Sequence, residues 1–294
     1  MTIGFVGLGN MGLPMCLNLS TKGHSILALD TCADAMHHAV QQGWVGLQSA
    51  TSLHHIASTC HIVITMLPGC TAVNQVMPVL LQSFSTTPSM IIDCSTVSPT
   101  TSRQWHTQAT ARGHAFIDAP VSGGVKGATD ATLTFMAGSI DEVALTKATP
   151  YLQDMGSRVI SCGGPGTGSA TKLCNNLALA AQMIGICEAM TLGESLGVDP
   201  TTLASVMNTS TAKCWSCEIN NPHPNVGRNA AGGYVGGFGT NLMLKDLTLA
   251  VSAGQETGVA MPLGSASKEL YRLAALRGWG DKDFGSMLQF LRGE

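Results

Sequence analysis

Residues 2–22, with the sequence TIGFVGLGNMGLPMCLNLSTK, decide how this chain folds. The apolar run Ile3–Val6 suits a buried strand, and a segment of helical period follows it to about Lys22. Glycines between the two have the spacing G-x-G-x-x-G, in which the first makes a tight turn, the second lets a pyrophosphate approach the backbone and the third lets the helix pack on the strand. We therefore predict a dinucleotide site that includes Gly7, Leu8, Gly9, Asn10, Met11 and Gly12.

Asp30 follows the next predicted strand, Ile26–Leu29, and indicates which dinucleotide binds. A carboxylate at this place can accept hydrogen bonds from the ribose hydroxyls of NAD, and it would repel the 2′-phosphate of NADP. The neighbouring Thr31 and Cys32 supply no arginine to offset that repulsion. The sequence therefore predicts NAD as the cofactor.

Short β-rich runs alternate with helix-length segments up to about residue 160. This alternation predicts βαβ units and a parallel sheet covered on both faces, and the remainder has only helical periods. We expect an α/β Rossmann-like N-terminal domain (1–163, binding NAD), then an all-α C-terminal domain (164–294, for substrate and oligomerisation), joined by a long interdomain helix near 169–196. The predicted strands are Ile3–Val6, Ile26–Leu29, Ile62–Met66, Met90–Ile92 and Ala115–Ile117.

Composition excludes several classes of protein. Of the 294 residues only 11% are charged, the net charge is −3 and neither sign forms a run, so we expect no nucleic-acid or membrane partner. The longest uncharged apolar stretch, residues 177–187, is shorter than the roughly 18 residues of a membrane span. Ten scattered cysteines predict free thiols rather than a disulfide framework. The N-terminus enters a strand at once, so we expect that any targeting segment has been removed or never existed.

Polar or turn-forming pairs end two later strands, at the sheet edge where open α/β sheets bind ligands. We expect them to line the nicotinamide half of the cofactor; they are Leu67, Pro68, Ser95 and Thr96.

Two further motifs predict the site of chemistry. The turn after Asp118 contains Ser122, Gly123 and Gly124, whose N–H groups and hydroxyl suit a carboxylate. Lys172 and Asn176 are four residues apart near the start of the long helix, so both lie on one helix face. The positive end of the helix dipole and an apolar surrounding favour a neutral lysine, which could exchange protons near neutral pH.

At these motifs, and at Lys245-Asp246-Leu247, the chain resembles the β-hydroxyacid dehydrogenase family, over essentially its whole length. The resemblance implies that Lys172 is the catalytic residue. It implies substrate binding by Ser122, Gly123, Gly124 and Asn176, and cofactor contacts by Thr96 and Lys245, to which we add Phe238 from the glycine-rich loop. It also implies a homodimer or homotetramer.

The resemblance also implies the reaction, which we expect to be the NAD-dependent oxidation of 3-hydroxyisobutyrate to methylmalonate semialdehyde in valine catabolism. Two alternatives stay open: another short β-hydroxy acid, such as D-glycerate formed from tartronate semialdehyde, or a relative that binds NAD without catalysis. Cys217 and Asn225 depart from the family pattern and leave the fine substrate specificity open. We expect a mitochondrial matrix location if the source is eukaryotic, and otherwise a cytoplasmic one.

We set aside two possible metal or redox sites. Cys214 and Cys217 form a C-x-x-C pair, but only His223 is close in sequence as a further zinc ligand, and the pair lies in the helical half. The pairs His37-His38 and His54-His55 are neighbours in sequence and would point apart on a helix. We expect no metal.

Overall fold

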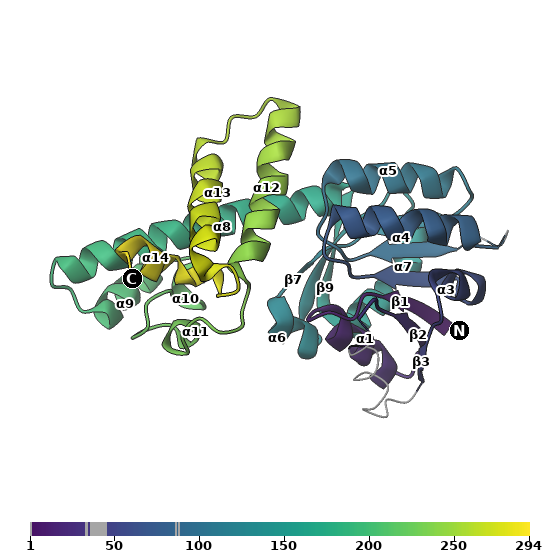
Figure 1. Cartoon of the computed structure of the whole chain (residues 1–294), viewed down its shortest axis with the longest axis horizontal. Coiled ribbons are helices and arrows are strands. Elements are labelled where there is room, and N and C mark those ends of the chain that lie inside the picture. Colours follow the sequence, from purple (N-terminus) through teal and green to yellow (C-terminus); the bar gives the residue numbers. More distant parts are fainter. Residues whose placement is uncertain (1, 33–34, 36–45, 86, 88) are drawn as a thin grey trace. The chain divides into compact units, whose positions relative to one another are not determined.

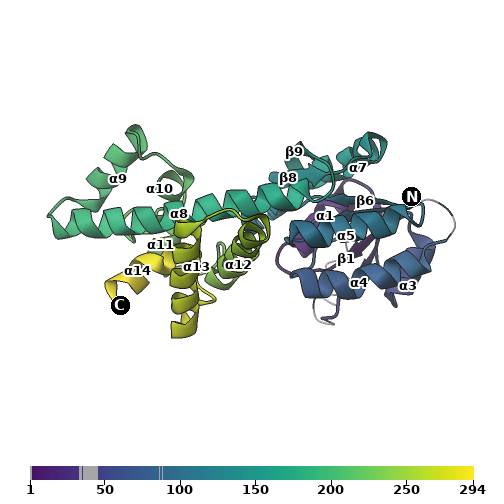
Figure 2. The same ribbon diagram turned by 90° about the horizontal axis from the view of Figure 1, so that it is seen from above.

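A computed structural model describes residues 2–32, 35, 46–85, 87 and 89–294 of the chain (Figure 1). The chain divides into two compact units, Met1–Lys172 and Leu173–Glu294. The long helix α8, Thr167–Ser195, begins in the first unit and continues in the second (Figure 2).

The first unit is built on a nine-stranded sheet with the order β3-β2-β1-β4-β5-β6-β8-β7, in which β9 also pairs with β8. All five predicted strands are confirmed to within a residue of each end. Four strands were not predicted: β3, β7, β8 and β9. The strands are β1 (Thr2–Val6), β2 (Ser25–Leu29), β3 (Leu47–Ser49), β4 (Ile62–Thr65), β5 (Met90–Asp93), β6 (Ala115–Asp118), β7 (Val121–Ser122), β8 (Leu133–Gly138) and β9 (Gly156–Gly163).

The predicted parallel sheet is confirmed, with antiparallel pairing at one side only. Along the sheet from β3 through β2, β1, β4 and β5 to β6, all neighbouring strands are parallel. Strand β8, in contrast, is antiparallel to both β6 and β7. Asp118 pairs with Gly138, Val121 with Phe135 and Ser122 with Thr134, so β6 and β7 follow one line along the same side of β8. The chain therefore reverses after β7, where the Ser122–Gly124 turn and α6 lead back into β8, an antiparallel neighbour that needs no long crossover connection.

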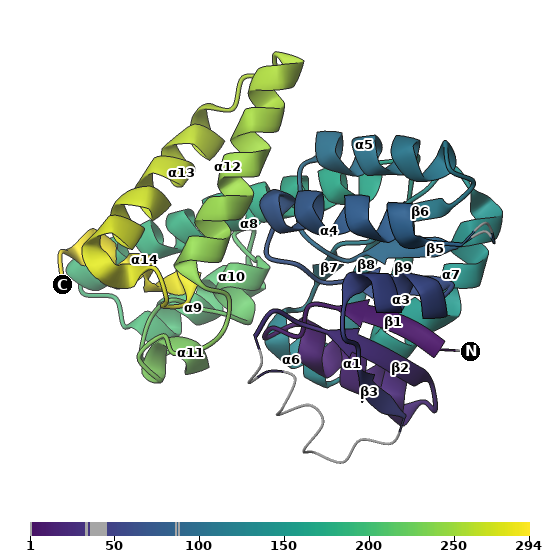
Figure 3. The same cartoon turned by 45° about the vertical axis from the view of Figure 1, so that its right-hand side comes forward.

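Two layers of helices cover the sheet. Residues on alternate positions of β5 and β6 belong to different cores: Ile92 and Ile117 face the layer of α1 and α7, and Ile91 and Phe116 face the layer of α3, α4 and α5. Figure 3 shows the second layer as three neighbouring helices. The helices are α1 (Gly12–Thr21), α3 (Leu53–Thr59), α4 (Cys70–Ser83), α5 (Pro99–Thr110), α6 (Gly124–Thr129) and α7 (Glu142–Met155).

The second unit is helical in the part of the chain that the structure describes, as predicted. Its core lies around Met183, Cys187, Leu247 and Tyr271, and α12 packs along α13. The predicted loop between Asn220 and Gly239 contains one short helix, α11. After α8 come α9 (Pro200–Thr209), α10 (Trp215–Glu218), α11 (Arg228–Ala231), α12 (Thr240–Thr257), α13 (Pro262–Ala274), a π-helical turn (Ala275–Trp279), a 3₁₀ turn (Phe284–Ser286) and α14 (Met287–Arg292).

Helix α8 confirms the prediction of one long helix and corrects the estimate of its hydropathy. By length and composition α8 could span a membrane. The sequence argument missed this because it considered only uninterrupted apolar stretches. However, 44% of its most apolar window is buried in the fold, and it also buries Lys172 and Asn176. Helices that are apolar all round are also found in the cores of large proteins. We therefore describe α8 as a core helix.

Candidate active site

The glycine-rich turn between β1 and α1 has three glycines with three different surroundings. Gly7 has a φ of +99°, and a Cβ there would lie 2.3 Å from the carbonyl oxygen of Met66. A Cβ on Gly12 would lie 1.9 Å from the carbonyl oxygen of Gly7, so helix and turn touch. A Cβ on Gly9 would meet nothing within 4 Å. The first and third glycines therefore serve packing, and the second borders open space beside the start of α1, where N–H groups favour phosphate.

Asp30 lies directly after β2 and is held by the same turn. Its Oδ2 accepts a hydrogen bond from the N–H of Leu8 at 2.5 Å, and its Oδ1 accepts one from Cys32 at 2.7 Å. Leu8, Gly9, Asn10 and Asp30 line a cavity of about 650 Å³, together with Val125 and Thr129 of α6. The structure thus brings these sequence-predicted residues to one cavity. Met11 is the N-cap residue of α1.

The predicted residues at the ends of β4 and β5 are also brought together. The N–H of Leu67 donates to Ser95 Oγ at 2.9 Å, so the two strand ends are tied directly. Pro68 and Thr96 are the next residues of the two segments. Asp93, which sequence reasoning missed, accepts from Thr65 Oγ1 at 2.8 Å and from the N–H of Ser95 at 3.1 Å. This network ties together the segments that follow the carboxyl ends of β4 and β5.

Asp93 is 1% exposed, and its Oδ2 has no hydrogen-bond partner. Burial raises the pKa of its carboxyl to about 6, although the bonds from Ser95 and Thr65 act in the opposite sense. An acid directly after the apolar run Met90–Ile92, at the carboxyl end of a predicted strand, is the signal that could have identified Asp93 from sequence.

The Ser122–Gly124 turn joins β7 to α6. Gly123 and Gly124 have φ values of +139° and +64°, conformations that favour glycine. A Cβ on Gly123 would lie 3.0 Å from Leu133, whereas one on Gly124 would meet nothing within 4 Å. Because α6 begins at Gly124 and also supplies Val125 and Thr129 to the Asp30 cavity, the turn lies beside the cofactor cavity.

Lys172 and Asn176 lie on α8, and their side chains are only 7% and 2% exposed. Asn176 Nδ2 donates to Asp246 Oδ2 at 2.6 Å, and Asn175 Nδ2 donates to Asn176 Oδ1 at 3.1 Å. These bonds fix which end of the Asn176 amide is oxygen and which is nitrogen. Asp246, missed as a site residue, therefore orients an amide that the sequence singled out.

Asp246 also faces Lys245, its neighbour on α12. Lys245 Nζ lies 3.3 Å from Asp246 Oδ1, an ion-pair distance, but that oxygen accepts no hydrogen bond of good geometry. One buried carboxylate thus lies between a predicted substrate ligand and a predicted cofactor ligand. Asp246 is part of the Lys245-Asp246-Leu247 motif, so the sequence contained the signal but not the pairing.

Phe238 is held by backbone and ring contacts in the second unit. Its N–H donates to Asp283 Oδ2 at 2.9 Å, and its ring meets Phe284 edge-on with centroids 6.1 Å apart. Trp215 stacks on the same Phe284 at 6.4 Å. Asp283 also accepts from Asn220 and Gly285, so it fixes the glycine-rich loop around Phe238.

The motifs that were set aside show no cluster of metal ligands among the described residues. Cys214 is the N-cap residue of α10, Cys217 is buried, and all ten cysteines are free thiols. His54 contacts Ser83, whereas His55 contacts Thr51, so the two side chains have separate partners. His37 and His38 lie outside the described residues.

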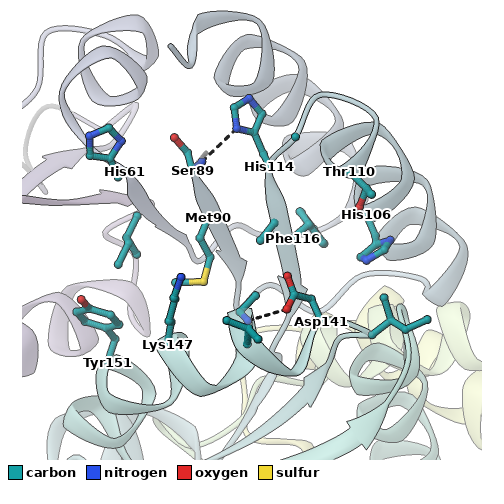
Figure 4. A pocket seen from close by; sticks show the side chains of 16 residues that line it. His61, Ser89, Met90, His106, Thr110, His114, Phe116, Asp141, Lys147 and Tyr151 are labelled. Carbon is teal, nitrogen blue, oxygen red and sulfur yellow. Dashed lines mark hydrogen bonds between the residues drawn. The ribbon is translucent and has the colours of Figure 1, made fainter. Parts of the chain in front are cut away.

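A second cavity of about 650 Å³ lies at the opposite edge of the sheet, between α5 and α7 (Figure 4). Burial lowers the pKa of both His106 and His114, which keeps these lining histidines neutral. The two cavities have about the same volume, so volume does not show which one is the functional site. Of the two, only the cavity at the carboxyl ends of the strands contains predicted site residues.

Two family models match the chain and together cover almost all of it. Residues 2–164 match the NAD binding domain of 6-phosphogluconate dehydrogenase. Residues 166–291 match the family described as NAD-binding of NADP-dependent 3-hydroxyisobutyrate dehydrogenase.

Similar proteins agree in name. The mitochondrial 3-hydroxyisobutyrate dehydrogenase of Bos taurus is 42% identical over 99% of this chain and 87% of its own length. A probable enzyme of the same name from Dictyostelium discoideum is 40% identical over 99% of this chain and 90% of its own. The solved structure of the Mycobacterium tuberculosis 3-hydroxyisobutyrate dehydrogenase with L-serine is 40% identical, covers 99% of both chains and superposes with a TM-score of 0.92.

Proposed function

The chain belongs to the 3-hydroxyisobutyrate dehydrogenase family of NAD-dependent oxidoreductases, and we propose that it oxidises 3-hydroxyisobutyrate to methylmalonate semialdehyde, a step of valine catabolism. One observation carries the proposal beyond the family name. Lys172 is buried on the same helix as Asn176, whose amide is oriented by Asp246. This is the arrangement that a proton-transfer group beside an oriented polar ligand requires.

The residues around the glycine turn fit NAD. NAD, when bound, supplies the acceptor for the hydride of the substrate carbinol carbon. Gly9 leaves space for the pyrophosphate against the start of α1. Asp30, already oriented by the N–H groups of Leu8 and Cys32, presents a carboxylate to the ribose hydroxyls. The same carboxylate disfavours the additional phosphate of NADP.

Further cofactor contacts come from the strand ends and from the helical unit. Leu67, Pro68, Ser95 and Thr96 would hold the nicotinamide half, and the bond between Leu67 and Ser95 keeps the two strand ends together. In the second unit, Phe238 and Lys245 would complete the cofactor site, each held by a buried carboxylate.

The substrate is a small hydroxy acid. Its carboxylate would be bound by the Ser122 hydroxyl and by the backbone at Gly123 and Gly124, where positive φ values turn successive peptide groups toward one side. Asn176 would bind the substrate through the part of its amide that Asp246 leaves available. Lys172, in its neutral form, accepts the hydroxyl proton as the carbonyl forms, and its ammonium form returns a proton in the reverse direction.

The first experiment is initial-rate NADH formation with (S)- and (R)-3-hydroxyisobutyrate, D-glycerate, L-serine and 3-hydroxypropionate, repeated with NADP. Fast turnover of one 3-hydroxyisobutyrate enantiomer with NAD is the expected result. Preference for D-glycerate would move the substrate but keep the reaction class. NAD binding with no turnover of any acid would refute the proposal and favour a non-catalytic role.

Lys172→Ala tests the assignment of the proton-transfer group. We expect kcat to fall by about 10²- to 10⁴-fold, the usual contribution of a positioned acid–base group, while the dissociation constant of NAD changes less than threefold. Turnover within tenfold of wild type from pH 6 to pH 10 would contradict this role.

The division of labour between domains, the oligomeric state and the location complete the proposal. Residues 1–163 would bind most of the cofactor and supply the Ser122–Gly124 turn for the substrate. Residues 164–294 would supply Lys172 and Asn176 to the substrate and form a homodimer or homotetramer. Several apolar side chains of the second unit are exposed, among them Leu263 and Leu276, and they could be covered in such an assembly. Sedimentation analysis tests the assembly. A eukaryotic source would place the protein in the mitochondrial matrix, since the Bos taurus and Dictyostelium discoideum relatives are named as mitochondrial, and any other source in the cytoplasm.

A further inference from the structure

Asp118, at the end of β6, is a buried carboxylate whose two oxygens both bind the start of α8. Oδ1 accepts a hydrogen bond from the N–H of Gly166 at 2.8 Å, and Oδ2 accepts one from the N–H of Ser169, also at 2.8 Å. The first N–H groups of a helix have no acceptor within the helix itself. A side chain from a neighbouring strand therefore supplies the cap that α8 needs.

The packing around this cap leaves little freedom. A Cβ on Gly168 would lie 2.1 Å from the carbonyl oxygen of Met136, and one on Gly138 would lie 2.6 Å from Asp118 Oδ1. Ser169 Oγ also pairs with Ser102 Oγ of α5 at 2.8 Å, in a buried bond. The start of α8 is thus held by β6, β8 and α5 at once.

The same residue is connected to both parts of the proposed chemical site. Along the chain, Asp118 leads through residues 119–121 to Ser122, the first residue of the proposed carboxylate-binding turn. Along α8, Lys172 follows Ser169 by three residues, which is about one helical turn or roughly 4.5 Å of rise. All of these residues belong to the first compact unit.

We propose that Asp118 is a positioning residue that, by capping α8 from β6, sets the place of Lys172 relative to the Ser122–Gly124 turn. The proposal rests on the proposed function in that Lys172 transfers the proton. A shift of about 1 Å in such a group can cost about 10²-fold in rate, because the reacting atoms must be within hydrogen-bond reach. Asp118 itself need not contact the substrate.

The electrostatics agree with this geometry. A carboxylate at the start of a helix is favourable because the macrodipole has its positive end there. Burial raises the pKa of Asp118 to about 6, the N–H bonds from Ser169 and Gly166 lower it, and Asp93 raises it. At pH 7.5 the group is therefore mostly ionised and able to accept both bonds.

Asp118→Asn is the main test, because the amide keeps the size of the side chain but only one of its two ends accepts a hydrogen bond. We expect kcat for the hydroxy acid to fall at least tenfold, while the dissociation constant of NAD stays within twofold. Hydrogen exchange at the amides of Gly166 or Ser169 should become faster. Ser102→Ala is the matched control: it removes the other buried bond at the same helix start, and its kcat should stay within twofold of wild type.

Three results would overturn the proposal: kcat of Asp118→Asn within twofold of wild type, an equal loss of kcat in Ser102→Ala, or a loss that appears in NAD affinity instead. If Asp118→Asn does not fold, Asp118→Glu is the second variant, since it keeps the charge but carries the carboxylate one methylene group further from the main chain, away from its place against the N–H groups of Gly166 and Ser169. It too should lower kcat at least tenfold. Failure of the proposed function is distinguishable, because the wild-type protein would then turn over no hydroxy acid while the protection of both amides persists.

Discussion

The bond between Asn176 and Asp246 leads to a quantitative prediction. Its N···O distance is 2.6 Å, both side chains are 2% exposed and one partner is an ionisable carboxyl. Hydrogen bonds to charged groups contribute about 1.5–3 kcal/mol, against about 0.5–1.5 kcal/mol for neutral pairs. Asp246→Asn keeps an acceptor for Asn176 and loses the charge, whereas Asp246→Ala leaves the Asn176 N–H without its acceptor.

We expect kcat/KM for the hydroxy acid to fall about fivefold in Asp246→Asn and about 10- to 150-fold in Asp246→Ala, since about 1.4 kcal/mol corresponds to a factor of ten. The losses in Asp246→Ala and Asn176→Ala should not add, because each removes the same bond. A double-mutant cycle should therefore give a coupling of about 1.5–3 kcal/mol.

The assay is initial-rate kinetics at saturating NAD, with the dissociation constant of NAD measured separately because Lys245 also faces Asp246. Asp199→Ala is a matched control in the same unit, since this exposed carboxylate only caps α9 through Thr202. Its kcat/KM should stay within twofold of wild type. Strict additivity of the Asn176 and Asp246 substitutions would falsify the view that Asp246 acts by orienting Asn176.

Two further predictions concern the first unit. Gly9→Val should melt within about 2 °C of wild type but bind NAD at least tenfold more weakly, because its side chain enters the open space that the pyrophosphate needs. Gly12→Ala should instead have a lower melting temperature than wild type, because its Cβ meets the Gly7 carbonyl oxygen. Equal melting temperatures for the two variants would contradict these separate roles of the two glycines. Burial raises the pKa of Asp93 to about 6 from an ordinary value of 3.8, so the folded state binds the proton more tightly than the unfolded state. The free energy of unfolding of the wild-type protein should therefore fall, relative to that of Asp93→Asn, as the pH rises from about 4 to about 6.5. The full loss corresponds to about 3 kcal/mol, and urea unfolding of both proteins across that range measures it; a constant difference would show that the buried charge has no such cost.

Local sequence determined the first half of the fold well. The five predicted strands are apolar runs bounded by turn residues, and each carries its own signal because three or four consecutive residues are buried. The missed strands lack that signal for different reasons. β3 and β7 have only three and two residues, and β9 is mostly exposed. Strand β8 is buried, but its antiparallel orientation is set by its pairing with β6 and β7, and a pairing between separate segments leaves no signal in the local sequence.

The candidate site divides in the same way. Motifs contiguous in sequence, such as Gly7–Gly12 and Ser122–Gly124, could be recognised because their backbone conformations require glycine locally. Asp93, Asp118 and Asp246 could not be assigned in this way, because each acts through a partner on another segment. The Asn176–Asp246 bond, for example, joins residues 70 apart in the chain.

The sequence by itself determined the fold class, the dinucleotide turn, the preference expected of Asp30 and the pairing of Lys172 with Asn176 on one helix, because all of these depend on residues within a few positions of one another. Only the tertiary structure decided which carboxylates are buried and what they hold: Asp118 the start of α8, and Asp246 the amide of Asn176. The physical reason is that a buried carboxylate is stable only where folding brings donors to it, and sequence spacing does not contain that information.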